Sequence, residues 1–364
     1  MREGFLAGCF DLNRIRCAVM GGIVFGGLSV AAAPALAFEP PLEVPAMRSD
    51  RLVGSPMLAV TSAGSRLVAV GLRGGILISD DQGKTWMQAS VPVSVDLVAV
   101  TFPSASQGWA VGHGGVVLHS HDAGLTWEKQ LDGLMASKLA IDFYTSNQDH
   151  LDGAAELLTK EQNLAVDKET QPFLDVFFTD DLHGYVVGTF NRIFATEDGG
   201  LHWKPLMHLT DNPTERHFYA IAGAGNQLFI SGEQGKVWRH DLQTNRFVSI
   251  DTPYNGTLFG VVPAAHDQLY VYGMRGSFFR SSDQGLTWER VSLPVDSNLV
   301  RVMPYGQDRL LAIAQSGEVL VSSDGARSFK PLPQSSPIPS FGATLLDEKL
   351  MALVGPLGVR VEGL

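Results

Sequence analysis

The chain has 364 residues, of which 39 are glycine and only 18% are charged, and its formal net charge is −11. This acidic balance argues against general nucleic-acid binding and against electrostatic attraction to anionic lipid. Abundant glycine beside short β-branched and aromatic runs predicts many short strands joined by turns.

Residues 1–37 have the pattern of an export signal. Arg14 and Arg16 precede an apolar run, and Ala35-Leu36-Ala37 is a cleavage site of the A-x-A kind before Phe38. A membrane anchor is the alternative, but the run is short, rich in glycine and followed by Pro34. We therefore expect a periplasmic or otherwise exported protein, cleaved near Ala37-Phe38 and not inserted in a membrane afterwards.

Both cysteines lie in this leader, at Cys9 and Cys17, so the mature chain has no disulfide framework and no cysteine-based metal site. The stretch Leu6-Ala7-Gly8-Cys9 resembles a lipobox. Because no apolar stretch of useful length precedes it, we expect the protein to be unlipidated.

Seven hydrophobic strands, each ending in a small residue, recur about 41 residues apart in most of the chain. This period fits a four-stranded antiparallel blade, with strands A to D in chain order, and predicts an all-β, seven-bladed β-propeller. A parallel β-helix is the rival fold, but its coils are shorter than this period. The small residues that mark the repeats are Gly71, Gly112, Gly188, Gly232, Gly273, Ala314 and Gly355.

An eight-residue phrase, S-x-D-x-G-x-T-W, begins eight residues after most of these markers. Ser and Asp can bond to nearby backbone N–H groups, Gly suits a positive φ, and Trp starts the next strand as a packing anchor. Turn bonding accounts for these carboxylates, so we expect a structural role and no catalytic or metal role. A copy at His240–Phe247 keeps the spacing but has lost the motif. The structural positions are Asp81, Gly83, Trp86, Asp122, Gly124, Trp127, Asp198, Gly200, Trp203, Asp283, Gly285, Trp288, Asp324 and Phe329.

The chain ends soon after strand C of the seventh repeat, so that blade lacks its fourth strand. Counting back from Gly71 by the usual interval reaches Pro45. We therefore expect Leu42–Ser49 to supply the missing strand, so that residues 38–364 form one ring closed by an N-terminal strand.

One repeat interval is longer than the others and marks an insertion, residues 131–172, between blades 2 and 3. Its stretches Leu134–Tyr144 and Leu151–Asp167 predict helices. D–A loops and B–C loops share one face of a propeller, so the insertion shares a face with the B–C loops. A structural elaboration and a partner-binding element both stay open for it.

The B–C loops carry the candidate site, a cationic rim of Arg73, His113, Arg192 and Arg275 on an acidic protein. Such a rim suits a carboxylate or an acidic tail, because arginine offers a two-pronged fork of donors. The alternative is that these residues are solvated or pair with Glu233, Asp96 and Asp175. His113, His119 and His121 lack the companions of a metal site, and we expect no metal and no cofactor.

The phrase at Val111–Trp127, kept in part at Val70–Trp86, Val187–Trp203 and Tyr272–Trp288, resembles the photosystem II stability/assembly factor family among the Asp-box (BNR) repeat propellers. The resemblance implies a non-catalytic propeller that escorts a membrane subunit. It further implies an arginine-rich contact patch, here Arg73, Arg192 and Arg275. We expect this chain to be an exported bacterial relative of the family that acts as a monomer. Its expected partner is a protein, either a membrane protein or a component of a transporter.

The alternative function is an Asp-box glycoside hydrolase, sialidase-like or xyloglucanase-like. Sialidases carry an R-I-P motif, which Arg192-Ile193-Phe194 does not match, and xyloglucanases place paired aspartates between two propellers. Asp96 and Asp175 are the pair that would serve such chemistry here. The sequence favours a protein that is not an enzyme.

Overall fold

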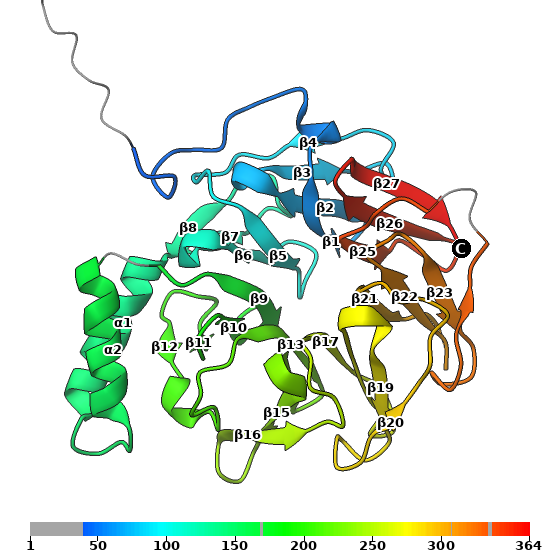
Figure 1. The fold of residues 1–364 in the computed structure, drawn as a ribbon. Coiled ribbons are helices and arrows are strands. Elements are labelled where there is room, and N and C mark those ends of the chain that lie inside the picture. Colours follow the sequence, from blue (N-terminus) through cyan, green and yellow to red (C-terminus); the bar gives the residue numbers. More distant parts are fainter. Residues whose placement is uncertain (1–38, 168–169, 307, 334–336) are drawn as a thin grey trace, which may run out of the picture. The chain divides into compact units, whose positions relative to one another are not determined.

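Seven small antiparallel sheets surround one axis. The computed structural model describes residues 39–167, 170–306, 308–333 and 337–364, and the predicted signal peptide lies outside them. In each sheet the strands follow chain order, and the first strands of neighbouring sheets contact one another around the axis (Figure 1). The predicted seven-bladed β-propeller is confirmed.

Blades 1 to 6 each have four strands in the described part of the chain. Those of blades 1 to 3 are β1 to β4 (Met57–Ala63, Arg66–Gly71, Ile76–Ser79, Met87–Gln88), β5 to β8 (Leu97–Thr101, Gly108–Gly112, Val117–Ser120, Glu128–Leu131) and β9 to β12 (Phe173–Phe178, Gly184–Gly188, Ile193–Thr196, Lys204–Pro205). Those of blades 4 to 6 are β13 to β16 (Phe218–Ala224, Gln227–Gly232, Lys236–Asp241, Arg246–Asp251), β17 to β20 (Leu258–Pro263, Leu269–Gly273, Phe278–Ser281, Glu289–Arg290) and β21 to β24 (Leu299–Pro304, Leu310–Ala314, Val319–Ser322, Lys330–Pro331). Blade 7 consists of β25 to β27 (Gly342–Leu345, Leu350–Gly355, Gly358–Gly363).

Each Asp-box forms the turn between strands C and D, and one set of bonds recurs. In blade 5, Ser281 Oγ donates to Asp283 Oδ1 (2.7 Å), and the N–H of Gly285 donates to Ser281 Oγ (2.8 Å). The backbone and side chain of Thr287 donate to the two oxygens of Asp283 at 2.8 and 2.6 Å. Two consecutive left-handed residues, Gln284 (φ 59°) and Gly285 (φ 91°), bend the chain so that the Asp283 carboxylate reaches the donors of Ser281 and Thr287.

Loss of the motif changes blade 4. Without the Asp-box, strands β15 and β16 pair along six residues each, from Lys236 opposite Asp251 to Asp241 opposite Arg246. Outer strands that follow an Asp-box have two residues in blades 1, 3, 5 and 6 and four residues in blade 2. The outer strand of blade 4 is therefore longer than each outer strand that follows an Asp-box.

The last aromatic residue of each phrase packs between its own blade and the preceding one. Trp127 lies in a cluster with Val68 of blade 1, Trp288 in a cluster with Ile250 of blade 4, and Phe329 in a cluster with Tyr270 of blade 5. Burying these rings between sheets gives a face-to-face core at each blade interface.

The N-terminal segment does not complete blade 7. No strand covers Leu42–Ser49, and the described part of blade 7 has three strands. Instead, the N–H of Ala46 donates to Val91 O (3.0 Å) and the N–H of Ser94 to Pro41 O (2.8 Å), which ties the segment to the loop after blade 1. The prediction of an N-terminal closing strand is wrong; Pro45, which has no N–H to donate, also suits a strand poorly.

Side chains close the ring instead. Met57, Leu67 and Leu77 of blade 1 share a buried cluster with Ala352 and Val354 of blade 7. The short helical turn η1 (Leu52–Gly54) contacts β27, and Leu52 packs against the same cluster.

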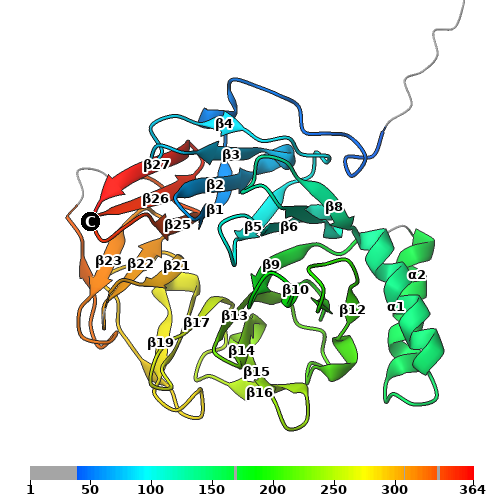
Figure 2. The same cartoon turned by 180° about the vertical axis from the view of Figure 1, so that it is seen from behind.

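The insertion contains two helices, α1 (Gly133–Asn147) and α2 (Ala154–Asp167), which lie side by side next to blades 2 and 3 (Figure 1 and Figure 2). Asp132 caps α1 by accepting from the N–H groups of Leu134 and Met135. No helix in the part of the chain that the structure describes has the length and apolar character to span a bilayer.

Candidate functional site

The face of the ring that carries the B–C turns and the D–A loops, called here the B–C face, holds two arginines in strained backbone positions. Arg73 (φ 53°) and Arg275 (φ 54°) each occupy the middle of a B–C turn, in the left-handed region. Their N–H groups donate to the side chains of Asp96 (2.8 Å) and Asn298 (3.1 Å), which precede strand A of the next blade.

A left-handed backbone costs a non-glycine residue roughly 1–2 kcal/mol. Blade 2 has Gly114 (φ 71°) at this position, which avoids that cost. Both arginine side chains are exposed, so burial does not repay the strain. Blade 4 has Gln234 (φ 54°) at the same position, so the left-handed conformation belongs to the turn and is not specific to arginine. Arg73 and Arg275 differ from Gln234 in placing an exposed positive charge there, which is the observation that favours a binding role for them.

The structure removes Arg192 from the candidate rim. Its side chain is 3% exposed, and its Nη1 donates to Glu161 Oε1 of α2 at 2.7 Å, where the glutamate side chain is 2% exposed. Its Nη2 donates to Ser137 Oγ of α1 (3.1 Å). Arg192 therefore fastens the two helices to blade 3, and the sequence prediction failed because the insertion supplies the acid that pairs with it.

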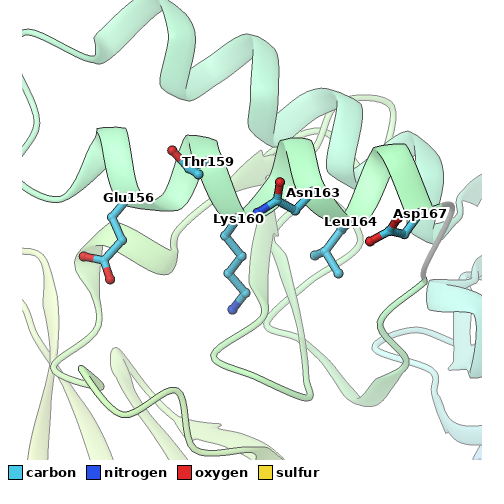
Figure 3. A pocket seen from close by; sticks show the side chains of 6 residues that line it. All are labelled: Glu156, Thr159, Lys160, Asn163, Leu164 and Asp167. Atoms are coloured by element: carbon cyan, nitrogen blue, oxygen red, sulfur yellow. The ribbon is translucent and has the colours of Figure 1, made fainter.

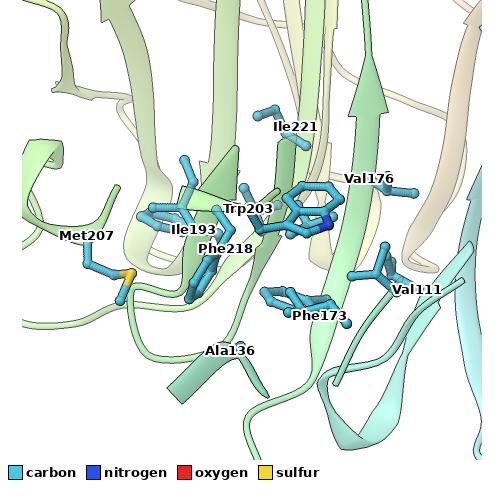
Figure 4. Packing of buried hydrophobic residues seen from close by; sticks show 14 of the residues in the cluster. Val111, Ala136, Phe173, Val176, Ile193, Trp203, Met207, Phe218 and Ile221 are labelled. Atoms are coloured by element: carbon cyan, nitrogen blue, oxygen red, sulfur yellow. The ribbon is translucent and has the colours of Figure 1, made fainter. Parts of the chain in front are cut away.

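Apolar packing supports this attachment. Ala136 and Tyr144 of α1 lie in one buried cluster with Phe173, Ile193 and Met207 (Figure 4). The cluster runs from blade 2 through blade 3 into blade 4, so the helices rest on a continuous core.

A pocket along α2 is lined by Glu156, Thr159, Lys160, Asn163, Leu164 and Asp167, and Lys160 extends from the helix toward the neighbouring loops (Figure 3). The ammonium group of Lys160 donates to Phe190 O (3.1 Å) and to Glu215 Oε1 (2.6 Å). A second polar tie therefore holds the insertion against the B–C face.

His113 begins the B–C turn of blade 2 and is exposed. Its N–H donates to Asp96 O (2.9 Å), so the backbone is fixed while the ring faces solvent. His119 is engaged elsewhere: its ring stacks on Trp109 and its Nε2 lies 2.8 Å from Gln107 Oε1. Among the described residues, no group of three or more His, Cys, Asp or Glu side chains is arranged to hold a metal ion.

Sequence reasoning missed Arg216, which precedes strand A of blade 4. Its Nε and Nη2 donate to Gln234 Oε1 in a B–C turn at 2.9 and 2.7 Å. Within the described residues these acceptors are neutral, so no carboxylate offsets its charge. Arg216 lies in a D–A loop. The only signal in the sequence for such a residue was that D–A loops and B–C loops lie on the same face of a propeller.

The carboxylates of the enzyme alternative serve the main chain. Burial raises the pKa of Asp175 to about 6, a value that would suit a general acid. Its two oxygens, however, accept from the N–H groups of Val176 and Ile221, both at 2.9 Å. Asp96 accepts from the N–H of Arg73. Both side chains therefore have a structural explanation.

The Asp-box carboxylates predict an acid-sensitive contribution to stability. Bonds from Thr287 and Ser281 lower the pKa of Asp283 to about 2. Because the pKa is lower in the folded state, the stabilisation is present above the unfolded value near 4 and is lost as pH falls toward about 2. Asn cannot ionise, so the difference in Tm between wild type and Asp283→Asn should shrink over this range in calorimetry. A difference that stays constant from pH 6 to pH 2 would contradict this assignment.

Comparisons with known proteins agree with this architecture. The sequence profile of the family described as photosynthesis system II assembly factor YCF48 matches residues 59–161 and 154–241, together half of the chain. The photosystem II assembly lipoprotein Ycf48 of Synechococcus sp. (strain CC9902) is 42% identical over 74 residues, 20% of this chain and 22% of that protein. The protein of the same name from Synechococcus sp. (strain CC9605) is 39% identical over 74 residues, 20% of each chain. The matches span about a fifth of the length of these relatives.

Solved structures are similar over most of the chain. The structure described as YCF48 bound to D1 peptide has a TM-score of 0.63 at 14% identity and covers 88% of this chain and 99% of its own. YCF48 from Cyanidioschyzon merolae has a TM-score of 0.61 at 14% identity, with 85% and 96% covered. The WD40 β-propeller domain of Doa1 also reaches 0.61, at 9% identity, with 88% and 96% covered. At these identities the likeness concerns the fold alone.

Proposed function

This chain belongs to the photosynthesis system II assembly factor YCF48 family, and we propose that it is an exported, non-catalytic propeller that assists the assembly or stability of a membrane or envelope protein complex. It acts as a monomer and binds a protein partner, a membrane protein or a transporter component. One structural relative is described as bound to a D1 peptide, which is a precedent for a peptide segment as the ligand.

The binding surface in this proposal is the B–C face, with Arg73, Arg275 and Arg216 as its cations and His113 beside them. The observation that carries the proposal is the pair of exposed arginines held in left-handed turns. In the described part of the chain none of these guanidinium groups forms an ion pair with a carboxylate, and such groups suit an acidic segment because each can bind a carboxylate with two parallel hydrogen bonds.

Export rests on the leader predicted for residues 1–37. The curated relatives are named lipoproteins, which supports a location outside the cytoplasm for those proteins. The non-catalytic role is supported by the structural bonds of Asp96 and Asp175, which leave the glycoside hydrolase alternative without a free pair of carboxylates.

The double variant Arg73→Glu/Arg275→Glu should lose capture of the partner, at least about tenfold in apparent Kd, once the partner has been identified by affinity purification from envelope extract and mass spectrometry. The variant Arg73→Gly/Arg275→Gly should lose capture as well, while its unfolding free energy stays within about 1 kcal/mol of wild type, because glycine suits these turns.

The matched control is Lys84→Glu/Lys349→Glu, which reverses two exposed lysines on the opposite face of the ring. Capture by this control should equal that of wild type. Equal capture by both double charge reversals would mean that the partner does not bind the B–C face.

A further inference from the structure

A cavity of about 710 Å³ opens between blades 5 and 6 on the face opposite the B–C face. Its walls come from the A–B loops of the two blades and from the Asp-box turn of blade 6, and Tyr270 and Leu310 line it. The volume lies within the roughly 300–1,000 Å³ that is typical of small-ligand sites.

Three arginines line this cavity: Arg280, Arg309 and Arg327. Arg280 is committed to the structure, because its Nε donates to Glu289 (2.8 Å) and its Nη1 to Gly325 O (3.3 Å). Arg327 donates from Nη1 to Asp324 O (3.0 Å) and keeps its other guanidinium donors. Arg309 lies 4.3 Å from the centre of the Tyr305 ring and makes no side-chain hydrogen bond or ion pair with the described residues.

Two acids, Asp308 and Asp324, also line the cavity, but neither forms an ion pair with Arg309 or Arg327 among the described residues. Both carboxylate oxygens of Asp324 bond within its own Asp-box, where they accept from Ser322 Oγ (2.8 Å) and from the N–H (3.0 Å) and Oγ (2.6 Å) of Ser328. Asp308 is exposed. The hydroxyl of Tyr270 bonds to none of the described side chains, although the residue is 4% exposed.

The repeat supplies an internal comparison. Arg66 occupies in blade 1 the position of Arg309 in blade 6, and it pairs with Asp80 at 2.7 Å. The position of Asp80 is taken in blade 6 by Ser323, so Arg309 has lost the acid that its counterpart uses. The position of Arg327 is held in the other Asp-boxes by Lys84, Leu125, Leu201 and Leu286, so the turn itself does not need arginine.

We propose that this cavity binds an organic carboxylate of about dipeptide size, gripped by the guanidinium groups of Arg309 and Arg327, with the Tyr270 hydroxyl as a further donor. The ligand is either an acidic peptide end or an acidic sugar, which share this chemistry. The site goes beyond the proposed partner binding and does not depend on it, since it lies on the opposite face of the ring.

Isothermal titration of the full chain with N-acetyl-Glu-Glu and with glucuronate tests the site, with N-acetyl-Gln-Gln and glucose as neutral probes. We expect binding of at least one acidic probe and of neither neutral probe. Binding of the peptide alone or of glucuronate alone identifies the source, and binding of both supports the shared carboxylate chemistry.

Variants Arg309→Ala and Arg327→Ala should each raise Kd about tenfold or more. Ser323→Asp should also raise Kd about tenfold or more, because the new carboxylate would form with Arg309 the ion pair that Asp80 forms with Arg66 in blade 1. Lys84→Ala, at the repeat position of Arg327 in blade 1, should leave Kd unchanged, and melting curves report on the fold of every variant. The proposal fails if neither acidic probe binds at millimolar concentration, or if Arg309→Ala and Ser323→Asp bind as wild type does.

Discussion

Replacing Arg192 with alanine is expected to lower the free energy of unfolding by about 3–5 kcal/mol, because the change leaves the buried Glu161 carboxylate without its counter-charge. The loss should be concentrated in the insertion. Hydrogen exchange of α1 and α2 should increase more than exchange in blades 5 and 6, since Arg192 also bonds to Ser137 of α1. Urea unfolding measures the total effect.

A double variant separates the charge from the packing. Glu161 Oε2 and Arg192 Nε are buried and have no hydrogen-bond partner among the residues that the structure describes, so desolvation of this pair is only partly offset. Arg192→Met/Glu161→Met should therefore recover most of the stability that Arg192→Ala loses. Lys138→Ala breaks an exposed pair with Asp142 on α1 and should cost no more than about 1 kcal/mol. If Arg192→Ala costs as little as Lys138→Ala, the pair does not hold the insertion in place.

The Asp-box turns could be predicted from the sequence, whereas the burial of Arg192 could not. The Asp-box carries its own bonding partners within eight residues, as Ser281, Asp283 and Thr287 show, so local chemistry is enough to find these turns. The number of blades follows from the regular spacing of the seven small marker residues. The pairing of Arg192 with Glu161 joins residues 31 positions apart through the docking of a helix. No repeat predicts that contact, because the insertion occurs once.

The candidate site divides in the same way. Arg73 and Arg275 were predicted from their place in the repeat, and the structure adds that each sits at a left-handed turn position, as Gln234 does in blade 4. Arg216 was missed because it belongs to a D–A loop, whose length and sequence vary from blade to blade. Its relation to Gln234 depends on how two neighbouring blades pack.

Ring closure was also predicted wrongly, and the reason lies in the spacing argument. The interval from one repeat to the next placed Leu42–Ser49 where a D strand would stand, but spacing does not report whether a segment reaches the next sheet. The loop at Val91 and Ser94 offers backbone partners to Ala46 and Pro41, and the segment pairs there. No strand of the described N-terminal region enters the sheet of blade 7. The interface between blades 1 and 7, called here the seam, is therefore held by side-chain packing of Met57, Leu67 and Leu77 against Ala352 and Val354.

Met57→Ala should therefore lower the free energy of unfolding by about 2–5 kcal/mol and also open the seam between blades 1 and 7 locally. Met57 is fully buried and shares its cluster with Ala352 and Val354 of blade 7. Hydrogen exchange measured by mass spectrometry should rise in β25 to β27 well before the protein unfolds. Closure by a shared strand would resist such opening through backbone hydrogen bonds, whereas a seam of side chains weakens with every methylene group that is removed.

Leu258→Ala is the matched control, because Leu258 is also fully buried and also begins strand A of its blade, in the uninterrupted part of the ring. Its global cost should be similar, since both changes remove a large apolar side chain from a packed core. Its effect on exchange should stay near blades 4 and 5, where Val237 and Phe279 share its cluster. Faster exchange of β25 to β27 in both variants would contradict local opening between blades 1 and 7, because the increase would then follow from the shared loss of global stability.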